Sequence, residues 1–147
     1  MSAMNTADLA HAASAKAASP KHILLVEDNP DDVELTRIAF QEAGSPHRLS
    51  VVTDGAEALD FLMARGRHAG REGAAHPDLV LLDLNLPKLD GREVLHAIRG
   101  HPATRSLPVV MLTTSAEPGD VDALYALGAN SYIQKPVEFE RFVEVVR

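Results

Sequence analysis

Five short runs rich in apolar residues recur along this chain, and each is followed by a segment whose apolar residues repeat with helical spacing. Strands of nearly continuous apolar character are buried on both faces, which is typical of a parallel sheet covered by helices. The alternation therefore predicts an α/β fold of five strand–helix units with right-handed crossovers. The expected strands are His22–Val26, Arg48–Thr53, Asp78–Asp83, Leu107–Thr113 and Ser131–Gln134.

Residues at the boundaries place the helices between these strands. Asn29-Pro30 supplies an N-cap followed by proline at the first helical position, and Gly44 is suited to end that helix near residue 43. Asp54-Gly55 leads from the second strand into the next helix. Further helices are expected at 56–64, 92–99 and about 119–127, followed by a last amphipathic segment that carries Phe139, Phe142, Val143 and Val146.

Helical periodicity also indicates which side chains belong to each repeat. In the first helix, the helical period is seen at Leu35, Ile38, Ala39 and Glu42. In the second helix, Leu59, Leu62 and Met63 are expected to face the core. The glycine-rich stretch from Arg65 to His76 shows no such period, and we predict an exposed loop there.

Composition narrows the class of protein. The 147 residues include 14 Lys+Arg against 21 Asp+Glu, a net charge of −7, and no cysteine. The length fits one domain, and the acidic balance argues against general binding to nucleic acid. The absence of cysteine excludes a disulfide scaffold and thiolate-held metals, and it fits a reducing compartment such as the cytoplasm. The apolar runs are too short to span a bilayer, so no membrane partner is expected.

The charge is unevenly distributed along the chain. Residues 1–20 hold one acid and one base and lack the features of a signal peptide, so we predict a mobile N-terminal tail before a folded domain at 21–147. That domain carries the whole net charge. Five of its acidic residues lie close together in the sequence, at Glu27, Asp28, Asp31, Asp32 and Glu34. We interpret the last three as a solvated helix start, where acids favour the helix dipole. Glu27 and Asp28 are different, because they directly follow an apolar run.

Polar residues also follow the other expected strands. They are Thr53 and Asp54, Asp83, Thr113 and Thr114, and Lys135. Parallel strands bring their carboxyl ends to one edge, where open α/β sheets bind ligands. Clustered carboxylates at that edge require a cation, and Mg²⁺ with oxygen ligands is suited to the role, while a lysine and a hydroxyl suit phosphoryl oxygens. Taken singly, each aspartate or threonine could instead be a helix cap, and Lys135 a solvated lysine.

Four motifs carry a family resemblance. In order they are Ile23–Asp28 (ILLVED), Leu81–Gly91 (LLDLNLPKLDG), Val109–Thr114 (VVMLTT) and Tyr132–Pro136 (YIQKP). The region from residue 21 to 147 resembles the receiver domain of two-component response regulators. The resemblance implies a flavodoxin-like (βα)5 doubly wound parallel sheet with strand order 2-1-3-4-5, in three α/β/α layers.

The resemblance also implies roles for matching residues. Asp83 is expected to be the phosphoacceptor, and Mg²⁺ is expected to bind Glu27, Asp28, Asp83 and the backbone carbonyl of Asn85. Thr113 and Lys135 would bind the phosphoryl group, and Tyr132 would be the switch aromatic that turns inward. The Lys135–Pro136 peptide bond is expected to be cis. The implied protein is a phosphoacceptor signalling protein rather than an enzyme with a separate substrate.

A narrower resemblance concerns the partner. The stretches PDLVLLDLNLPKLDGREVLHAIR and LPVVMLTTS and the long segment 65–76 resemble small stand-alone regulators paired with bacterial phytochromes. The expected partner is therefore a sensor histidine kinase, of the bacteriophytochrome type. With no output domain expected after the receiver, the signal would leave by protein contact. We expect a homodimer or output surface at 119–127, 131–134 and the last segment, with candidates Leu124, Tyr125, Tyr132 and Phe142.

Other functions fit the residues less well. A phosphatase with an aspartate nucleophile needs a second acid two positions after it, where this chain has Asn85. An FMN carrier would need a Ser/Thr/Gly-rich loop after the first strand and stacking aromatics, yet the chain has no Trp. A receiver-like scaffold that is not phosphorylated would lack the acceptor or the lysine, and both are present. Because the seven histidines show no i, i+3 or i, i+4 pair, a histidine metal site has little support.

Overall fold

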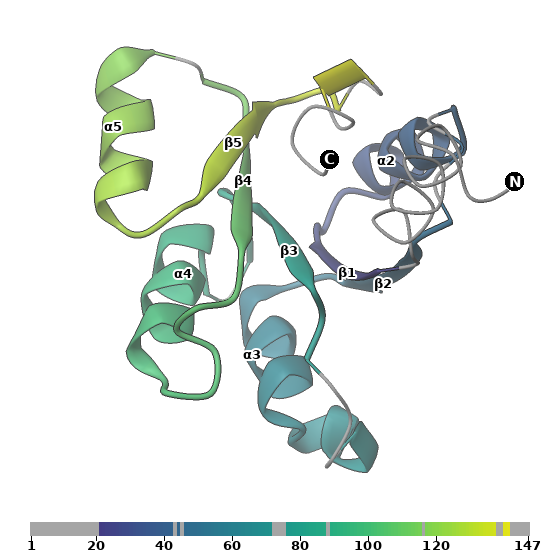
Figure 1. The fold of residues 1–147 in the computed structure, drawn as a ribbon, viewed down its shortest axis with the longest axis vertical. Coiled ribbons are helices and arrows are strands. Elements are labelled where there is room, and N and C mark those ends of the chain that lie inside the picture. The colour runs from purple at the N-terminus through teal and green to yellow at the C-terminus, as the bar shows by residue number, and fades with distance from the viewer. Residues whose placement is uncertain are drawn as a thin grey trace, which may run out of the picture.

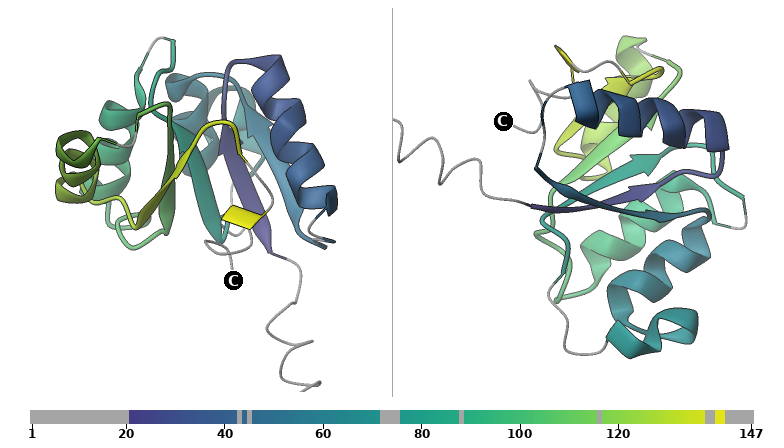
Figure 2. Two further views of the ribbon diagram at one scale, coloured as in Figure 1. Left: turned by 90° about the horizontal axis from the view of Figure 1, so that it is seen from above. Right: turned by 90° about the vertical axis from the view of Figure 1, so that its right-hand side faces the viewer.

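The computed structural model describes residues 21–42, 44, 46–71, 76–87, 89–115, 117–137 and 140–141. They form a five-stranded parallel sheet in the order β2-β1-β3-β4-β5 (Figures 1 and 2). The strands are β1 (His22–Val26), β2 (Arg48–Val52), β3 (Leu79–Asp83), β4 (Val109–Thr113) and β5 (Ser131–Gln134). The flavodoxin-like strand order expected from the sequence is confirmed.

Helices cover both faces of this sheet. Helix α2 (Pro30–Glu42) lies on one face, and on the other lie α3 (Gly55–Met63), α4 (Gly91–Gly100) and α5 (Pro118–Ala126) (Figure 1). None of the helices in the described ranges is long and apolar enough to cross a membrane.

Caps form where the sequence predicted them. The Asn29 side chain accepts the Asp31 and Asp32 backbone N–H groups at 2.8 and 3.3 Å, and Asp54 accepts that of Glu57 at 2.7 Å. These bonds satisfy helix N–H groups that have no partner within the helix. They fix both helix starts at the carboxyl edge of the sheet.

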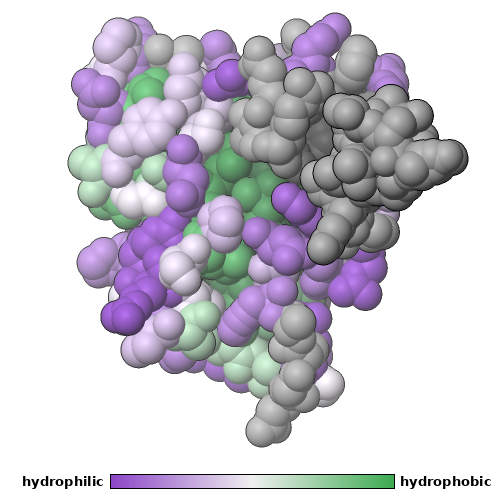
Figure 3. All heavy atoms as spheres, viewed as in Figure 1, coloured by the Kyte–Doolittle hydropathy of each residue, from purple (hydrophilic) through white to green (hydrophobic). Residues whose placement is uncertain are grey.

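Among the residues that the structure describes, the core consists of two apolar clusters separated by the sheet. Alternate side chains of each strand point to opposite faces, so Leu24 and Leu82 join the cluster under α3, α4 and α5, while Ile23 and Leu81 join the one under α2. All four side chains are fully buried. In the space-filling view, hydrophobic side chains show in the middle of the face, with hydrophilic side chains around them (Figure 3). Burial on both faces explains the continuous apolar runs of the sequence.

Two details of the sequence prediction are wrong. Gly66–Arg71 forms a 3-10 helix, η1, with a kink at His68, where an irregular loop was predicted, although most of its residues are exposed as expected. Positive φ angles at Ala64 and Gly66 turn the chain back over the end of α3. In α2 the buried residues are Thr36, Ala39 and Phe40, whereas Leu35 and Ile38 are 41% and 39% exposed. The apolar pattern predicted the wrong buried face because it excluded Thr36, which is polar. Thr36 can be buried because its hydroxyl donates to the Asp32 carbonyl at 2.9 Å.

Other boundaries differ from the prediction by one or two residues, as expected at element ends. In α3, Leu62 is buried as predicted, while Leu59 and Met63 are only half-buried. The predicted tail at 1–20 and the last amphipathic segment from Phe139 to Val146 lie outside the described residues, except for 140 and 141.

Candidate functional site

The ends of β1 and β3 bring an acidic cluster to the carboxyl edge of the sheet. Glu27 and Asp28 follow β1, and Asp83 is the last residue of β3, which pairs with β1. One carboxylate oxygen from each of the three residues lies within 4.8 Å of the others. Glu27 and Asp83 are buried, and Asp28 is exposed. The sheet register thus assembles the three acids that the sequence nominated.

Lys135, just beyond β5, reaches across this cluster. Its ammonium lies 2.7 Å from Glu27 Oε1 and 3.2 Å from Asp83 Oδ2. Its backbone N–H donates to the Thr113 carbonyl at 2.8 Å, which ties its position to the end of β4. The Lys135–Pro136 peptide bond is cis. Although burial by itself lowers it, the Asp32 and Glu27 carboxylates raise the pKa of Lys135 above its ordinary value. The lysine therefore carries its positive charge at any physiological pH.

Asp32 belongs to this site, which corrects its interpretation as part of a solvated helix start. Its Oδ2 lies 2.8 Å from Lys135 Nζ, and its side chain is 26% exposed. The N-terminus of α2 stands over the carboxyl edge of the sheet, and Asp32 lies in the first turn of this helix. No local pattern in the sequence marked this contact, because Lys135 lies more than 100 residues further along the chain.

The neighbouring strand contributes the hydroxyl of Thr113, which is 2% exposed. Its Oγ1 accepts the Ser115 backbone N–H at 3.1 Å, which leaves the hydroxyl proton available for another acceptor. Asn85, two residues after Asp83, donates its backbone N–H to Asp83 Oδ1 at 3.3 Å, and its side chain is exposed. Asn85 thus contacts the Asp83 carboxylate, and Thr113 lies at the end of β4, the strand that pairs with β3.

Gly91 allows the loop after Asp83 to fold tightly. A Cβ at this position would lie 2.3 Å from the Asp83 carbonyl oxygen, so a side chain there cannot be accommodated without movement of the backbone. The Gly91 N–H donates to the Leu84 carbonyl at 2.9 Å. The chain from Asp83 to α4 is thereby held close to the cluster.

Tyr132 lies in β5, is half-buried and packs against the apolar cluster under α3, α4 and α5. Its ring meets that of Tyr125, on α5, edge to face with centroids 6.3 Å apart. The Arg141 guanidinium lies 5.6 Å from the Tyr132 ring centroid and donates to the Tyr132 carbonyl at 3.1 Å. Tyr125 is 45% exposed, so this aromatic pair reaches the surface. Leu124, by contrast, is buried, and Phe142 lies outside the described residues.

The acidic cluster fits a divalent cation. Glu27 Oε1 is buried and makes no hydrogen bond of acceptable geometry, although the Lys135 ammonium is nearby. Burial first, and then the adjacent Asp83, raise the pKa of Glu27 to about 7 despite that lysine. One ammonium therefore leaves the cluster short of positive charge. Carboxylate oxygens at this spacing are the donors that Mg²⁺ and similar hard cations take.

Comparison with known proteins agrees with this geometry. Residues 23–147 match the model of the response regulator receiver domain. The chain belongs to this family. The receiver is also 41% identical over 128 residues to Response regulator Rcp1 of Synechocystis sp., covering 87% of this chain and 85% of that protein. Family membership makes it a signalling domain of the kind that works with histidine kinases.

Solved structures place the receiver close to phytochrome response regulators. The bacteriophytochrome response regulator RtBRR is 48% identical, with a TM-score of 0.80 over 86% of this chain and 76% of that one. The Mn(2+)-bound form of Rcp1 is 42% identical, with a TM-score of 0.71 over 86% and 89% of the two chains. The phosphorylated cyanobacterial phytochrome response regulator RcpA is 42% identical, with a TM-score of 0.72 over 87% and 89%.

Arg99, on α4, is a structural residue that the sequence did not reveal. Its guanidinium donates to the carbonyls of Gly128, Leu107 and Arg105 and to Asn130 Oδ1, at 2.6 to 3.2 Å. These bonds join α4 to the segments that enter β4 and β5, the strands that carry Thr113 and Lys135. Its acceptors lie up to 31 residues away along the chain, and no local pattern marks such contacts.

Proposed function

We propose that this receiver accepts a phosphoryl group on Asp83 from a sensor histidine kinase, with Mg²⁺ held by Glu27, Asp28, Asp83 and the Asn85 carbonyl. The observation that carries the proposal is that the Asp83 carboxylate lies next to both a lysine ammonium and two other carboxylates. Its Oδ2 lies 3.2 Å from the Lys135 ammonium, and its carboxylate is one of three whose oxygens approach within 4.8 Å. In this proposal, Asp83 belongs both to the metal site and to the site that receives the phosphoryl group.

Charge is the main obstacle to this transfer, because both the carboxylate and the phosphoryl donor are negative. Lys135 offsets the repulsion beside the attacking oxygen, and a bound divalent cation supplies further positive charge. An Asp83 oxygen forms the new bond to phosphorus while the bond from phosphorus to the donor breaks, and the electron pair of that bond leaves with the donor. Thr113, on the neighbouring strand, has a hydroxyl proton available for a phosphoryl oxygen.

The route of the signal is part of the same proposal. Movement of Thr113 toward the phosphoryl group would free space for Tyr132 to turn inward, and this would change the surface at α5 and β5. Tyr125 and Tyr132 already pair there, so we propose that a homodimer or output contact forms on this surface. We propose that the partner kinase is of the bacteriophytochrome type. Two similar structures support this, because RtBRR is named as a bacteriophytochrome response regulator and RcpA as a cyanobacterial phytochrome response regulator. The receiver would act in the cytoplasm, where such a kinase domain meets ATP.

The test is phosphorylation by a small donor. The chain is incubated with Mg²⁺ and acetyl phosphate, and intact mass is measured before and after treatment with base. We expect a phosphoryl adduct that survives acid and is lost in base, and no adduct after Asp83→Asn or with EDTA. Light scattering on the same samples reports whether the dimer follows phosphorylation. An equal adduct on Asp83→Asn contradicts the proposal, and the absence of any adduct favours an unphosphorylated scaffold.

A further inference from the structure

Strand β2 lies at one end of the sheet, and no described strand lies beyond it (Figure 2). On the inner side, the Arg48 N–H donates to the Lys21 carbonyl, and the Val52 carbonyl accepts the N–H of the residue that follows β1. In a parallel pair, a residue directs both of its backbone groups to the same neighbour, and the next residue directs its own to the opposite side. Leu49 and Val51 therefore present their N–H and C=O groups outward, where no described group bonds them.

Two exposed arginines lie on opposite faces of this free edge. Arg48 is on the face that α3 covers, because Val52, on the same side of β2, belongs to the apolar cluster there. Arg37, on α2, lies over the other face. It lines a hollow of about 230 Å³ together with Phe40, Gln41, His47 and Leu49. Among the described residues, no carboxylate pairs with either arginine.

The surroundings of this edge are positive, although the chain as a whole carries a net charge of −7. Burial first, and then the nearby Lys21, lower the pKa of His47. Burial and then Arg48 lower the pKa of His22, on β1, and Asp78 opposes both shifts with a smaller effect. No acid is among the described residues that line the hollow. A negative group beside β2 would therefore meet an excess of positive charge.

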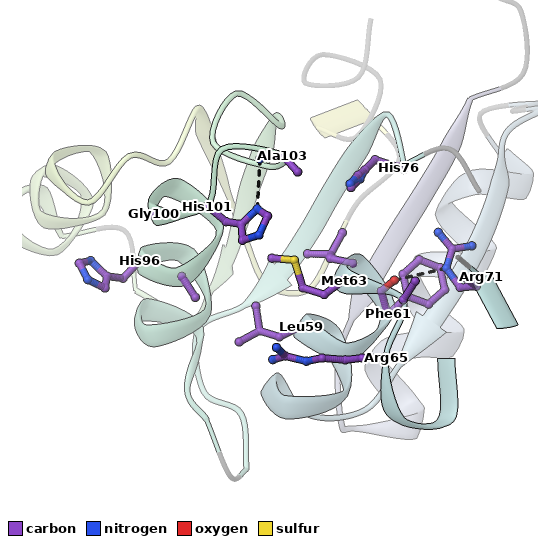
Figure 4. A pocket seen from close by; sticks show the side chains of 13 residues that line it. Leu59, Phe61, Met63, Arg65, Arg71, His76, His96, Gly100, His101 and Ala103 are labelled. Carbon is purple, nitrogen blue, oxygen red and sulfur yellow. Dashed lines mark hydrogen bonds between the residues drawn. The ribbon is translucent and has the colours of Figure 1, made fainter. Parts of the chain in front are cut away.

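The arginines of η1 are already engaged. The Arg71 guanidinium lies 3.7 Å from the Phe61 ring centroid, and its Nε donates to the Phe61 carbonyl at 3.3 Å, beside a cavity of about 860 Å³ between α3 and α4 (Figure 4). Arg67 lies 3.5 Å from a Glu57 oxygen. The charge of a partner at this edge would therefore be read by the arginines of α2 and β2.

We propose that the free edge of β2 binds an extended acidic segment of a partner protein as an added strand. Backbone bonds to Leu49 and Val51 would hold the segment, and its alternate side chains would meet the two faces of the edge. One acidic side chain would lie beside Arg37 and another, on the opposite face, beside Arg48. An apolar side chain on the α2 face would cover Leu49 and enter the hollow.

Charge also excludes the simplest alternative occupant, which is a second copy of the chain. Two copies joined through β2 would bring Arg37 and Arg48 of both chains to one seam, and like charges on paired strands are unfavourable. Charged residues on an edge strand discourage pairing with identical strands, and the same charges attract an acidic one. The edge is at the other end of the sheet from β5, so this binding leaves the surface at α5 and β5 uncovered.

The experiment follows backbone amide NMR signals and hydrogen exchange of the full chain with the peptide TEEVTV, blocked at both ends. In an extended peptide, its first glutamate and both valines lie on one face and its second glutamate lies on the other. We expect the Leu49 and Val51 amides to shift and to exchange more slowly with peptide at low-millimolar concentration. The Arg48 and Val52 amides face β1 and should exchange as before.

Three control peptides separate charge from strand pairing. TKKVTV reverses the charge, and TEEPTV keeps the charge but replaces a backbone N–H with proline. Neither should change the Leu49 and Val51 amides at the same concentration. TQQVTV removes the charge and should bind roughly five-fold or more weakly than TEEVTV.

Variants of the chain complete the test. Arg37→Gln and Arg48→Gln should each weaken TEEVTV binding roughly two- to five-fold, whereas Arg92→Gln removes an exposed charge on α4 and should bind as the unmodified chain does. Val51→Pro removes one outward N–H, a change that an edge strand can tolerate, and should abolish binding.

Four results would overturn the proposal. TEEVTV leaves the Leu49 and Val51 amides unchanged, TKKVTV or TEEPTV binds equally well, or both arginine variants bind like Arg92→Gln. The fourth is protection of the same amides that rises with protein concentration without peptide, because a second copy then occupies the edge. The peptide comparison decides the question even if Val51→Pro fails to fold.

Discussion

Replacing Lys135 with methionine keeps the length of the side chain and removes the ammonium that three carboxylates share. Glu27 and Asp83, whose side chains are 1% and 5% exposed, would remain buried without it. Breaking a buried ion pair typically costs about 3–5 kcal/mol. Asp32 is 26% exposed and recovers hydration, and contacts that share one ammonium are not additive. We therefore expect a loss near the lower limit, about 3 kcal/mol, in metal-free protein.

A divalent cation should reverse most of this loss. The cation would neutralise the same carboxylates that Lys135 contacts, so the difference between variant and unmodified chain should fall to about 1 kcal/mol or less at saturating Mg²⁺. Competition for these carboxylates also ends in the variant, so its Mg²⁺ affinity should rise. The phosphoryl adduct should nevertheless be weak, because the positive charge beside the attacking oxygen is gone.

The assay is urea unfolding of both proteins in EDTA and in excess Mg²⁺, with the exposed Arg92→Met as the control for loss of one surface charge. The control should change the free energy of unfolding by less than about 0.5 kcal/mol in either buffer. A loss below about 1 kcal/mol for Lys135→Met in EDTA would refute the account of a charge-deficient cluster. The same account would be refuted if Lys135→Met lost equal stability in EDTA and in excess Mg²⁺.

Three further predictions concern the surroundings of the site. Asp32→Asn should lower the free energy of unfolding in EDTA by about 1 kcal/mol, because one partly exposed contact to Lys135 is lost. If urea unfolding shows no change, Asp32 is a solvated acid that does not contribute to the site. Arg99→Met should cost about 2–3 kcal/mol in the same assay, since four oxygens lose their donor, and a neutral result would mean that water replaces it. Burial, and then two neighbouring arginines, lower the pKa of His22 below 6.5. The unfolded chain therefore binds the proton first, so stability should fall as pH drops through 6.5, and unfolding at several pH values should show a shallower dependence for His22→Gln. Parallel pH curves for the two proteins would contradict this.

Local sequence was sufficient for much of the fold. Each strand was recognisable because burial on both faces demands a continuous apolar run, as in Ile23–Val26. Helix starts were recognisable because Asn29 and Asp54 bond N–H groups only two or three residues ahead. The burial pattern of α2 was not recognisable, because the Thr36 hydroxyl is satisfied within its own helix and can be buried where a polar residue was expected outside.

The sequence by itself determined which chemical groups reach the carboxyl edge of the sheet, since strand ends are local features and parallel strands share an edge. It thereby nominated Glu27, Asp28, Asp83, Thr113 and Lys135 for the site. Only the tertiary structure decided that Asp32 shares the Lys135 ammonium, that Arg99 joins α4 to the segments before β4 and β5, and that α3 and α4 leave a cavity between them. The reason is physical: these features depend on the distances between side chains of different elements, which packing sets and sequence spacing does not.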